Sequence, residues 1–247
     1  MVQPVLQWQA GKLTAIRPET RQTKSFTFAL PKWMAHRPGQ HYDVRLTAPD
    51  GYQTQRSYSI ASPPERVGEL ELTVERIPDG EVSPYLHDVL TPGDQLEVRG
   101  PIGGYFVWDV SLGGPLLLVG GGSGVVPLMA MLRHRVAQHS TVPARILYSS
   151  RTAEDVIYRD ELNGMAAGDP ELEVLYTFTR QPPAGWTGYR RRIDAAMLAE
   201  VIKPFDKRAR VYVCGPTLLV EAVANALVQM ELPIEQIRTE RFGPTGA

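Results

Sequence analysis

The chain has 247 residues, of which 43% are apolar and 21% charged, enough for two domains of ordinary size, each with its own core. A formal net charge of −1 supplies no global field that would recruit nucleic acid or an anionic membrane, so neither is expected as a partner. The single cysteine, Cys214, excludes a disulfide framework, a cysteine zinc site and a Cys-ligated iron–sulfur cluster within these residues. The five histidines lack any metal-binding spacing, and no metal site is predicted.

Two segments bear on membrane contact. The first 25 residues lack the apolar stretch of a signal peptide. Residues 111–132 carry no charge, but six glycines and two prolines divide this segment into strand, turn and helix. We therefore reject a transmembrane helix and expect a soluble, cytoplasmic protein.

Residues 1–110 have the pattern of short antiparallel strands. Strands are predicted at 25–30, 42–48, 57–61, 70–76 and 95–100, with a helical insert at 82–90. Turn residues such as Pro-Gly and Pro-Asp-Gly separate them. This spacing predicts a small antiparallel β-barrel or sandwich.

Residues 111–247 alternate between strand and helix patterns. Strands are predicted at 116–119, 145–150, 173–179, 210–214 and 237–240, with helices at 126–138, 156–166, 194–202 and 217–230. Such alternation indicates a parallel sheet covered by helices on both faces, an α/β Rossmann-like domain. The sequence thus predicts two domains, with a boundary near residue 110.

A glycine-rich turn joins the first strand of the second half to its first helix. It contains Gly122, Ser123 and Gly124, with Pro127 standing where the third glycine of G-x-G-x-x-G would be. Glycines let the backbone approach a pyrophosphate, and the helix N-terminus offers free N–H groups. The turn predicts nucleotide binding, although glycines can also serve a tight turn alone.

The end of the second predicted strand bears on which nucleotide is bound. An NAD-preferring fold usually places Asp or Glu there, whereas this chain has Ser149, Ser150 and Arg151. Hydroxyls and a guanidinium favour a 2′-phosphate. Arg180 and the arginines at 190–192, Arg191 among them, add possible partners for this phosphate. Alternatively, the run at 190–192 is an ordinary solvated basic face. These residues predict a preference for NADP(H) over NAD(H).

A short motif, Arg56-Ser57-Tyr58-Ser59, lies on a predicted strand of the first half. Pro38-Gly39-Gln40 precedes it, and Gly80-Glu81-Val82-Ser83 follows it. In this order the motifs resemble those of the ferredoxin–NADP reductase superfamily. The resemblance runs from Pro38 almost to the end of the chain, at Glu240-Arg241-Phe242.

The resemblance implies that the motif strand holds FAD. Arg56 would pair with the FAD pyrophosphate, Tyr58 would stack on the isoalloxazine, and Ser59 would hydrogen-bond near flavin N5. Ser57, between Arg56 and Tyr58 in the motif, is included among the cofactor-binding residues. An aromatic neighbour supplies stacking area and an arginine neutralises phosphate charge. Alternatively, Tyr58 is a half-buried strand residue and Arg56 a surface charge.

Further roles follow from the same resemblance. The turn that contains Gly80, Val82 and Ser83 resembles a second pyrophosphate-binding turn, which favours FAD over FMN. The segment from Gly122 to Pro127 resembles the nicotinamide-nucleotide loop.

The C-terminal part supplies the remaining candidates. Cys214-Gly215-Pro216 resembles the element that brings a sulfur to the nicotinamide. Alternatively, Cys214 is a small buried residue at a strand end. Glu240 is either a site residue or an exposed strand carboxylate. Phe242, or the tail that follows it, would cover the flavin.

The implied reaction is hydride transfer from NADPH to FAD, which involves Tyr58, Ser59, Cys214 and Glu240, followed by electron release to a separate ferredoxin, flavodoxin or oxygenase component. The chain resembles a stand-alone reductase without a fused iron–sulfur domain. Two alternatives stay open: an electron-transfer subunit of a larger flavoprotein complex, and a non-catalytic flavin- or nucleotide-binding sensor.

Overall fold

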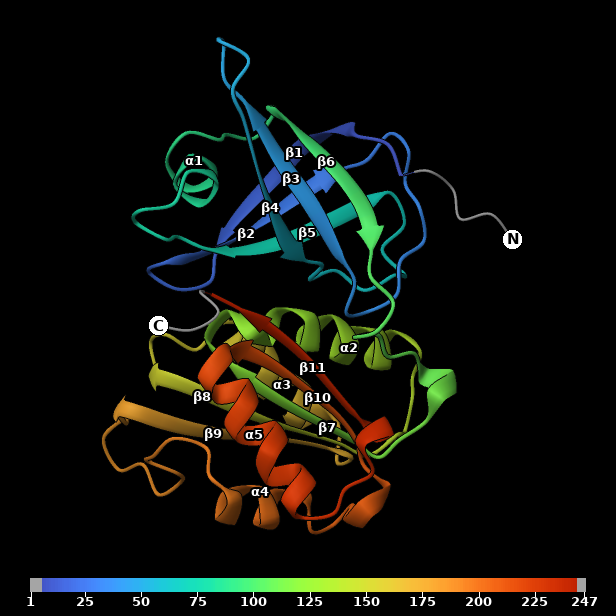
Figure 1. The fold of residues 1–247 in the computed structure, drawn as a ribbon, viewed down its shortest axis with the longest axis vertical. Helices are drawn as coiled ribbons and strands as arrows, with labels where there is room; N and C mark the ends of the chain where they lie inside the picture. Colours follow the sequence, from blue (N-terminus) through green and yellow to red (C-terminus); the bar gives the residue numbers. More distant parts are fainter. Residues whose placement is uncertain (1–5, 244–247) are drawn as a thin grey trace.

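The computed structural model describes residues 6–243, which form two stacked domains (Figure 1). The upper domain in Figure 1 is built from antiparallel strands, and the lower from parallel strands with helices on both faces. This is the two-domain class that the sequence predicts, and the prediction is confirmed.

The first domain contains one six-stranded antiparallel sheet in the order β4-β3-β6-β1-β2-β5. Its elements are β1 (Gln9–Pro18), β2 (Thr23–Ala29), β3 (His41–Thr47), β4 (Gln53–Ser59), β5 (Glu69–Glu75), α1 (Val82–Asp88) and β6 (Gln95–Ile102). A bridge between Ile60, just after β4, and Leu72 in β5 brings the two edges of the sheet together. The sheet therefore curls into a barrel around a core that includes Leu13, Phe26 and Val98.

The second domain contains a five-stranded parallel sheet in the order β11-β10-β7-β8-β9. Its strands are β7 (Leu116–Gly121), β8 (Ala144–Thr152), β9 (Leu172–Gln181), β10 (Arg210–Pro216) and β11 (Ile237–Phe242). Its helices are α2 (Val125–Ala137), α3 (Arg159–Gly168), α4 (Ala195–Ile202) and α5 (Thr217–Gln229).

Strand β7 shows why the sheet needs helices on both faces. Leu116 and Leu118 pack in the apolar cluster that includes α2 and α3, whereas Leu117 and Val119 pack in the cluster that includes α4 and α5. Alternate residues point to opposite faces, so a strand that is apolar throughout is buried on both.

Most elements match the predicted ranges to within one to two residues at each end, and three of the departures have a clear physical reason. Strand β1 has no counterpart among the predicted strands, because Gly11 and Thr14 interrupt its apolar alternation. Strand β4 begins four residues before the predicted 57–61 and ends two before it, because Ile60 and Ala61 turn into the core. Helix α3 begins three residues late because Tyr158 adopts a left-handed backbone, with φ of 59°.

The two domains share a buried interface. Ala61 and Phe106 from the first domain pack in the same apolar cluster as helix α2. Within the described part of the chain, no helix has the length and apolarity needed to cross a membrane.

Candidate functional site

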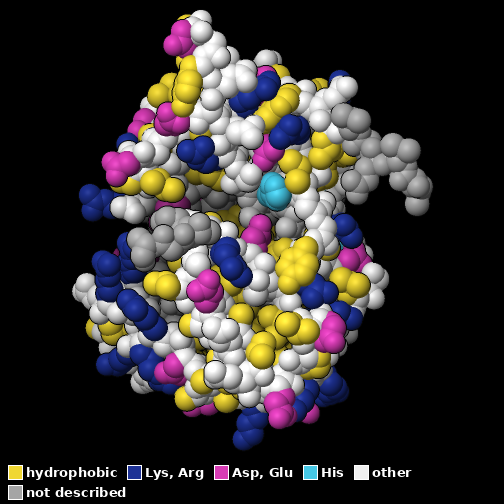
Figure 2. Space-filling model, in the orientation of Figure 1, with side chains coloured by type: hydrophobic (Ala, Val, Ile, Leu, Met, Phe, Trp, Pro, Cys, Tyr) yellow, Lys and Arg dark blue, Asp and Glu magenta, His cyan; other side chains and the backbone are white. Residues whose placement is uncertain are grey.

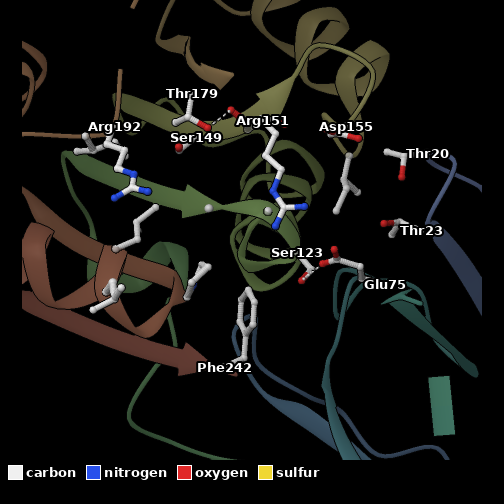
Figure 3. A pocket seen from close by; sticks show the side chains of 18 of the residues that line it. Thr20, Thr23, Glu75, Ser123, Ser149, Arg151, Asp155, Thr179, Arg192 and Phe242 are labelled. Atoms are coloured by element: carbon white, nitrogen blue, oxygen red, sulfur yellow. Dashed lines mark hydrogen bonds between the residues drawn. The ribbon is translucent and has the colours of Figure 1, made fainter. Parts of the chain in front are cut away.

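A cavity of about 570 Å³ lies between the barrel and the carboxyl edge of the parallel sheet (Figure 3). The barrel contributes the loop after β1 and the end of β5, while the second domain contributes the glycine turn and the ends of β8, β9, β10 and β11. Most of its lining residues are polar or charged, or belong to the glycine turn and the strand ends. They include Thr20, Thr23, Glu75, Gly122, Ser123, Ser149, Ser150, Arg151, Asp155, Thr179, Arg192, Pro216 and Phe242. Ligands of open α/β sheets bind at this edge.

The glycine turn forms the floor of the cavity. Residues 122–124 form a short 3-10 turn that leads directly into α2. A Cβ on Gly124 would lie 2.2 Å from the carbonyl oxygen of Cys214, so the turn can pack against β10 only as glycine. Gly122 has a φ of +54° and open space around its Cα. Pro127 is buried within the first turn of α2 and does not line the cavity.

Cys214 and Glu240 lie directly opposite each other on neighbouring strands β10 and β11. Cys214 is buried, and burial raises the pKa of its thiol, with the Glu240 carboxylate adding to the effect. Burial also raises the pKa of Glu240 to about 7. Its Oε2 atom is buried and has no hydrogen-bond partner among the described residues. Such an orphaned carboxyl oxygen at a strand end marks a place where a ligand group could bind.

The motif strand β4 presents two of its side chains beside α1. The Thr54 hydroxyl donates to Glu81, the residue before α1, at 2.8 Å, so this face of β4 lies beside α1. Arg56 and Tyr58 lie on the same face, because alternate residues of a strand point to the same side. Arg56 is exposed and has no acidic partner within 4 Å in residues 6–243. Tyr58 is half-buried, and burial raises its pKa to about 12. The Arg56 guanidinium donates to the Gln55 carbonyl oxygen at 2.7 Å. The arrangement thus offers a guanidinium that no carboxylate of the described residues neutralises, and an aromatic ring on the same face of the strand.

The other residues of this motif lie elsewhere. Ser57 donates to Asp43 Oδ1 at 2.7 Å, on the face of β4 opposite Arg56 and Tyr58. Ser59 ends the strand and is half-buried. None of the four motif residues lines the cavity.

The turn before α1 is ordered by its own contacts. Ser83 accepts a hydrogen bond from the backbone N–H of Ile77 at 3.0 Å, and Gly80 packs against Ser83 Oγ. Val82 and Ser83 are both buried. In this conformation the Ser83 hydroxyl shapes the turn rather than the cavity.

The predicted arginines separate into two groups. Arg151 lines the cavity, as does Arg192, which was not itself a candidate but belongs to the run 190–192. Neither side chain forms an ion pair within residues 6–243, and Figure 3 shows both reaching into the cavity. Arg191 instead pairs with Asp194 at 2.5 Å, outside the cavity, and Arg180 lies exposed near the end of β9 without lining it.

Figure 2 shows Lys and Arg side chains gathered on the left flank of the lower domain, beside the hollow between the domains. This flank corresponds to the ends of β8 and β9 in Figure 1.

Comparisons with known proteins match this architecture in both halves. Residues 10–107 match the model of the oxidoreductase FAD-binding domain, and residues 118–225 match that of the oxidoreductase NAD-binding domain. The chain is 33% identical over 240 residues to ferredoxin–NADP reductase B of Sorangium cellulosum, covering 94% of this chain and 96% of that protein. The chain belongs to the ferredoxin–NADP reductase family.

Other relatives in this family are longer or share only the fold. The chain is 33% identical over 233 residues to the glycine betaine monooxygenase reductase subunit of Chromohalobacter salexigens, covering 93% of this chain but only 62% of that protein. The structure of the flavohem-like FAD/NAD-binding domain of nitric oxide dioxygenase from Vibrio cholerae superposes with a TM-score of 0.85 at 22% identity, covering 96% of this chain and 99% of that one.

The two domains of this ferredoxin–NADP reductase family member thus bind FAD and a nicotinamide nucleotide. The residues present fit both groups. Arg56, which forms no ion pair within residues 6–243, lies beside Tyr58 and suits a flavin with an anionic tail. Arg151 and Arg192, likewise without an ion pair in that range, line the cavity with the glycine turn and suit a phosphorylated nucleotide.

Several cavity residues were not found by sequence reasoning. Four of them come from the barrel: Thr20, Gln22, Thr23 and Glu75. In the second domain, Asp155 follows β8 and Thr179 lies in β9. No local motif marks the barrel residues, because they reach the nucleotide domain only through the packing of the two domains. Phe242 does line the cavity, while the tail at 244–247, proposed as an alternative cover, lies outside the described residues.

Proposed function

We propose that this chain is an NAD(P)H-dependent FAD oxidoreductase that passes electrons from NADPH to a separate protein carrier. The observation that carries the proposal is the cavity between the two domains. It combines the glycine turn with two arginines that form no ion pair in the part of the chain that the structure describes. FAD supplies the hydride-accepting chemistry when bound, and the protein binds, orients and tunes the reacting groups.

The second domain orients the nucleotide in this proposal. The glycine turn and the N-terminus of α2 receive the diphosphate, since Gly122 has open space where a side chain would lie, while the buried Gly124 lets the turn pack against β10. Ser123, Gly215 and Pro216 lie beside it, which directs the nicotinamide toward Cys214 and Glu240. With a pKa of about 7, Glu240 can hold a proton near neutral pH at the atom that now lacks a partner.

The first domain holds the flavin. With FAD bound, Arg56 would neutralise the diphosphate, Tyr58 would supply the stacking surface and Ser59 would bond near N5. The turn of Gly80, Val82 and Ser83 would also hold the diphosphate. Phe242, which lines the cavity and is partly exposed, covers the approach to the ring and excludes water until the nucleotide enters.

We further propose that NADP(H) is preferred over NAD(H). Ser149, Ser150 and Arg151 at the end of β8 line the same cavity as Arg192. Together they offer hydroxyls and two guanidinium groups, neither of them in an ion pair within residues 6–243, to a 2′-phosphate. Arg192 takes the place that the sequence analysis assigned to Arg191, because the Arg191 guanidinium is held by Asp194. Arg180 is retained as a more distant contributor of positive charge.

The electron acceptor in this proposal is a ferredoxin, a flavodoxin or an oxygenase component. The relative from Chromohalobacter salexigens is a reductase subunit of a monooxygenase, and the relative from Sorangium cellulosum is a ferredoxin–NADP reductase. A cytoplasmic site of action follows from the use of NADPH. Because the chain spans only 62% of the monooxygenase reductase subunit, action as the flavin part of a larger complex is the second candidate.

Anaerobic stopped-flow reduction of the flavin-loaded protein by NADPH and by NADH tests the proposal. We expect flavin bleaching with both and a lower KM for NADPH. Arg151→Ala and Arg192→Ala should each raise the KM for NADPH about tenfold or more and leave that for NADH nearly unchanged, because a charge-assisted contact to the extra phosphate contributes about 1.5–3 kcal/mol. Arg191→Ala is the matched control and should change neither. Absence of flavin binding would overturn the function, and equal KM values with both nucleotides would overturn the NADP preference.

A further inference from the structure

Strand β5 contacts the nucleotide domain through one face. Its residues Leu70, Leu72 and Val74 point into the barrel core, so Glu71, Thr73 and Glu75 point outward. Glu71 accepts from Arg133 of α2 at 2.6 Å, Thr73 accepts from the Tyr158 hydroxyl just before α3, and Glu75 accepts from Ser123 of the glycine turn at 2.9 Å. These three contacts cross from one domain to the other at every second residue.

The three contacts differ in how firmly they are held. Glu71 and Thr73 are buried, and Glu71 has Arg66 at 3.1 Å as a second cationic partner. Glu75 is only half-buried, lines the cavity, and has no cation within 4 Å in residues 6–243. Its one side-chain hydrogen bond in that range is the bond from Ser123, so it is the contact most easily exchanged.

The position of Glu75 conflicts with the ligand that the cavity receives. Ser123 lines the cavity and lies two residues before Val125, the first residue of α2, a helix of 13 residues whose N-terminus favours anions. In Figure 3 the Glu75 carboxylate lies against Ser123, on the side of the cavity opposite Arg192. A nucleotide diphosphate that approached Ser123 would meet this carboxylate, and two anions at contact distance repel each other.

We propose that Glu75 determines nucleotide affinity by competing with the diphosphate for Ser123 and the N-terminus of α2. In the free protein its carboxylate accepts a hydrogen bond from the Ser123 hydroxyl and so joins the two domains where both residues line the cavity. When a nicotinamide dinucleotide binds, its diphosphate displaces the Glu75 side chain, which is exposed enough to turn toward solvent. The effect applies equally to NADPH and NADH, because both carry the same diphosphate. The inference rests on the proposed binding of the nucleotide at the glycine turn.

Glu75→Gln tests this competition, because glutamine retains an oxygen that accepts from Ser123 but carries no charge. Glu69→Gln is the matched control: it removes the same charge from the same outward face of β5, about 20 Å from residue 75, where Glu69 lies exposed near Arg66. Isothermal titration calorimetry of the FAD-loaded proteins with NADP⁺ and with NAD⁺ gives the dissociation constants, and steady-state turnover with NADPH gives KM and kcat separately.

We expect Glu75→Gln to lower the dissociation constants of both nucleotides by about tenfold at low ionic strength. The gain should shrink in 0.5 M salt because the repulsion is screened. KM should fall in parallel while kcat changes less than about twofold, since the removed repulsion acts on binding. Glu69→Gln should behave as the unsubstituted protein does.

Two results would overturn the inference while leaving the proposed function intact. Unchanged affinity in Glu75→Gln would mean that Glu75 is not near the diphosphate. Weaker affinity would mean that Glu75 is itself a ligand of the nucleotide, for example through ribose hydroxyls. If the unsubstituted protein bound neither nucleotide, the inference and the proposed function would fall together.

Discussion

The ion pair between Arg133 and Glu71 is the contact whose loss should most weaken the junction between the domains. The Arg133 guanidinium donates to Glu71 at 2.6 Å and to the Ala61 carbonyl oxygen at 2.8 Å, both on the barrel. Within its own domain it donates to both oxygens of Glu161 at 2.7 Å. The Arg133 and Glu71 side chains are only 7% and 6% exposed. Arg133→Met keeps the apolar volume and removes every one of these bonds.

The size of the effect follows from what each partner retains. Removing one member of a buried pair costs about 3–5 kcal/mol, because the other charge stays buried and uncompensated. Glu71 keeps Arg66 at 3.1 Å, and Glu161 is 32% exposed and can be rehydrated. We therefore expect the low end, a loss of about 3 kcal/mol in the free energy of unfolding.

Urea unfolding of the FAD-loaded protein at pH 7 measures this loss. Arg66→Met is the matched control, because Arg66 pairs with the same carboxylate but is 39% exposed, and we expect it to cost about 1 kcal/mol or less. The double variant Arg133→Met with Glu71→Met should recover most of the stability, since the carboxylate that still lacks Arg133, that of Glu161, is 32% exposed and can be rehydrated. Equal losses from Arg133→Met and Arg66→Met would refute the reasoning, as would a loss below about 1 kcal/mol from Arg133→Met.

Three further predictions concern the glycine turn, the buried carboxyl group and the flavin. Gly124→Ala would place its Cβ 2.2 Å from a backbone oxygen of Cys214, so we expect a loss of about 1–3 kcal/mol in stability and at least about tenfold weaker nucleotide binding. Gly164→Ala in α3 is the control and should cost nothing, because there is open space around Gly164. Normal thermal unfolding and normal affinity in Gly124→Ala would contradict the packing argument. Burial raises the pKa of Glu240 to about 7, so its contribution to stability is full below its unfolded pKa and is lost as the pH rises through about 7. Glu240→Gln should therefore match the unsubstituted protein in urea unfolding at pH 4 and exceed it at pH 8 by roughly 1–3 kcal/mol, and a pH-independent difference would count against a buried charge there. Tyr58→Ala should weaken flavin retention about tenfold, measured as the flavin-to-protein ratio after dialysis, and a ratio equal to that of the unsubstituted protein would show that Tyr58 is not the stacking residue.

The sequence was sufficient to predict those features that depend on residues close together in the chain. Glycine at 122 and 124 between an apolar strand and a helical pattern is a short-range signal, and the turn lies at the cavity floor as that signal implies. The strand–helix alternation of residues 111–247 likewise predicts a parallel sheet, because parallel strands need a crossover between them. Strand boundaries were less accurate, as in β4, because Ile60 and Ala61 are apolar in sequence but are buried beyond the end of the strand.

The sequence by itself therefore determined the two-domain class, the glycine turn and the residue types suited to a flavin and a nucleotide, since each depends on spacing within a few residues. Only the tertiary structure decided which arginine of the run 190–192 faces the cavity, because Asp194 holds Arg191 outside it while Arg192 lines it. It also decided that Glu75, an unremarked residue at the end of a barrel strand, lies against Ser123, 48 residues later in the chain. Contacts between domains depend on how two finished surfaces pack together, and no local periodicity in the chain encodes that docking.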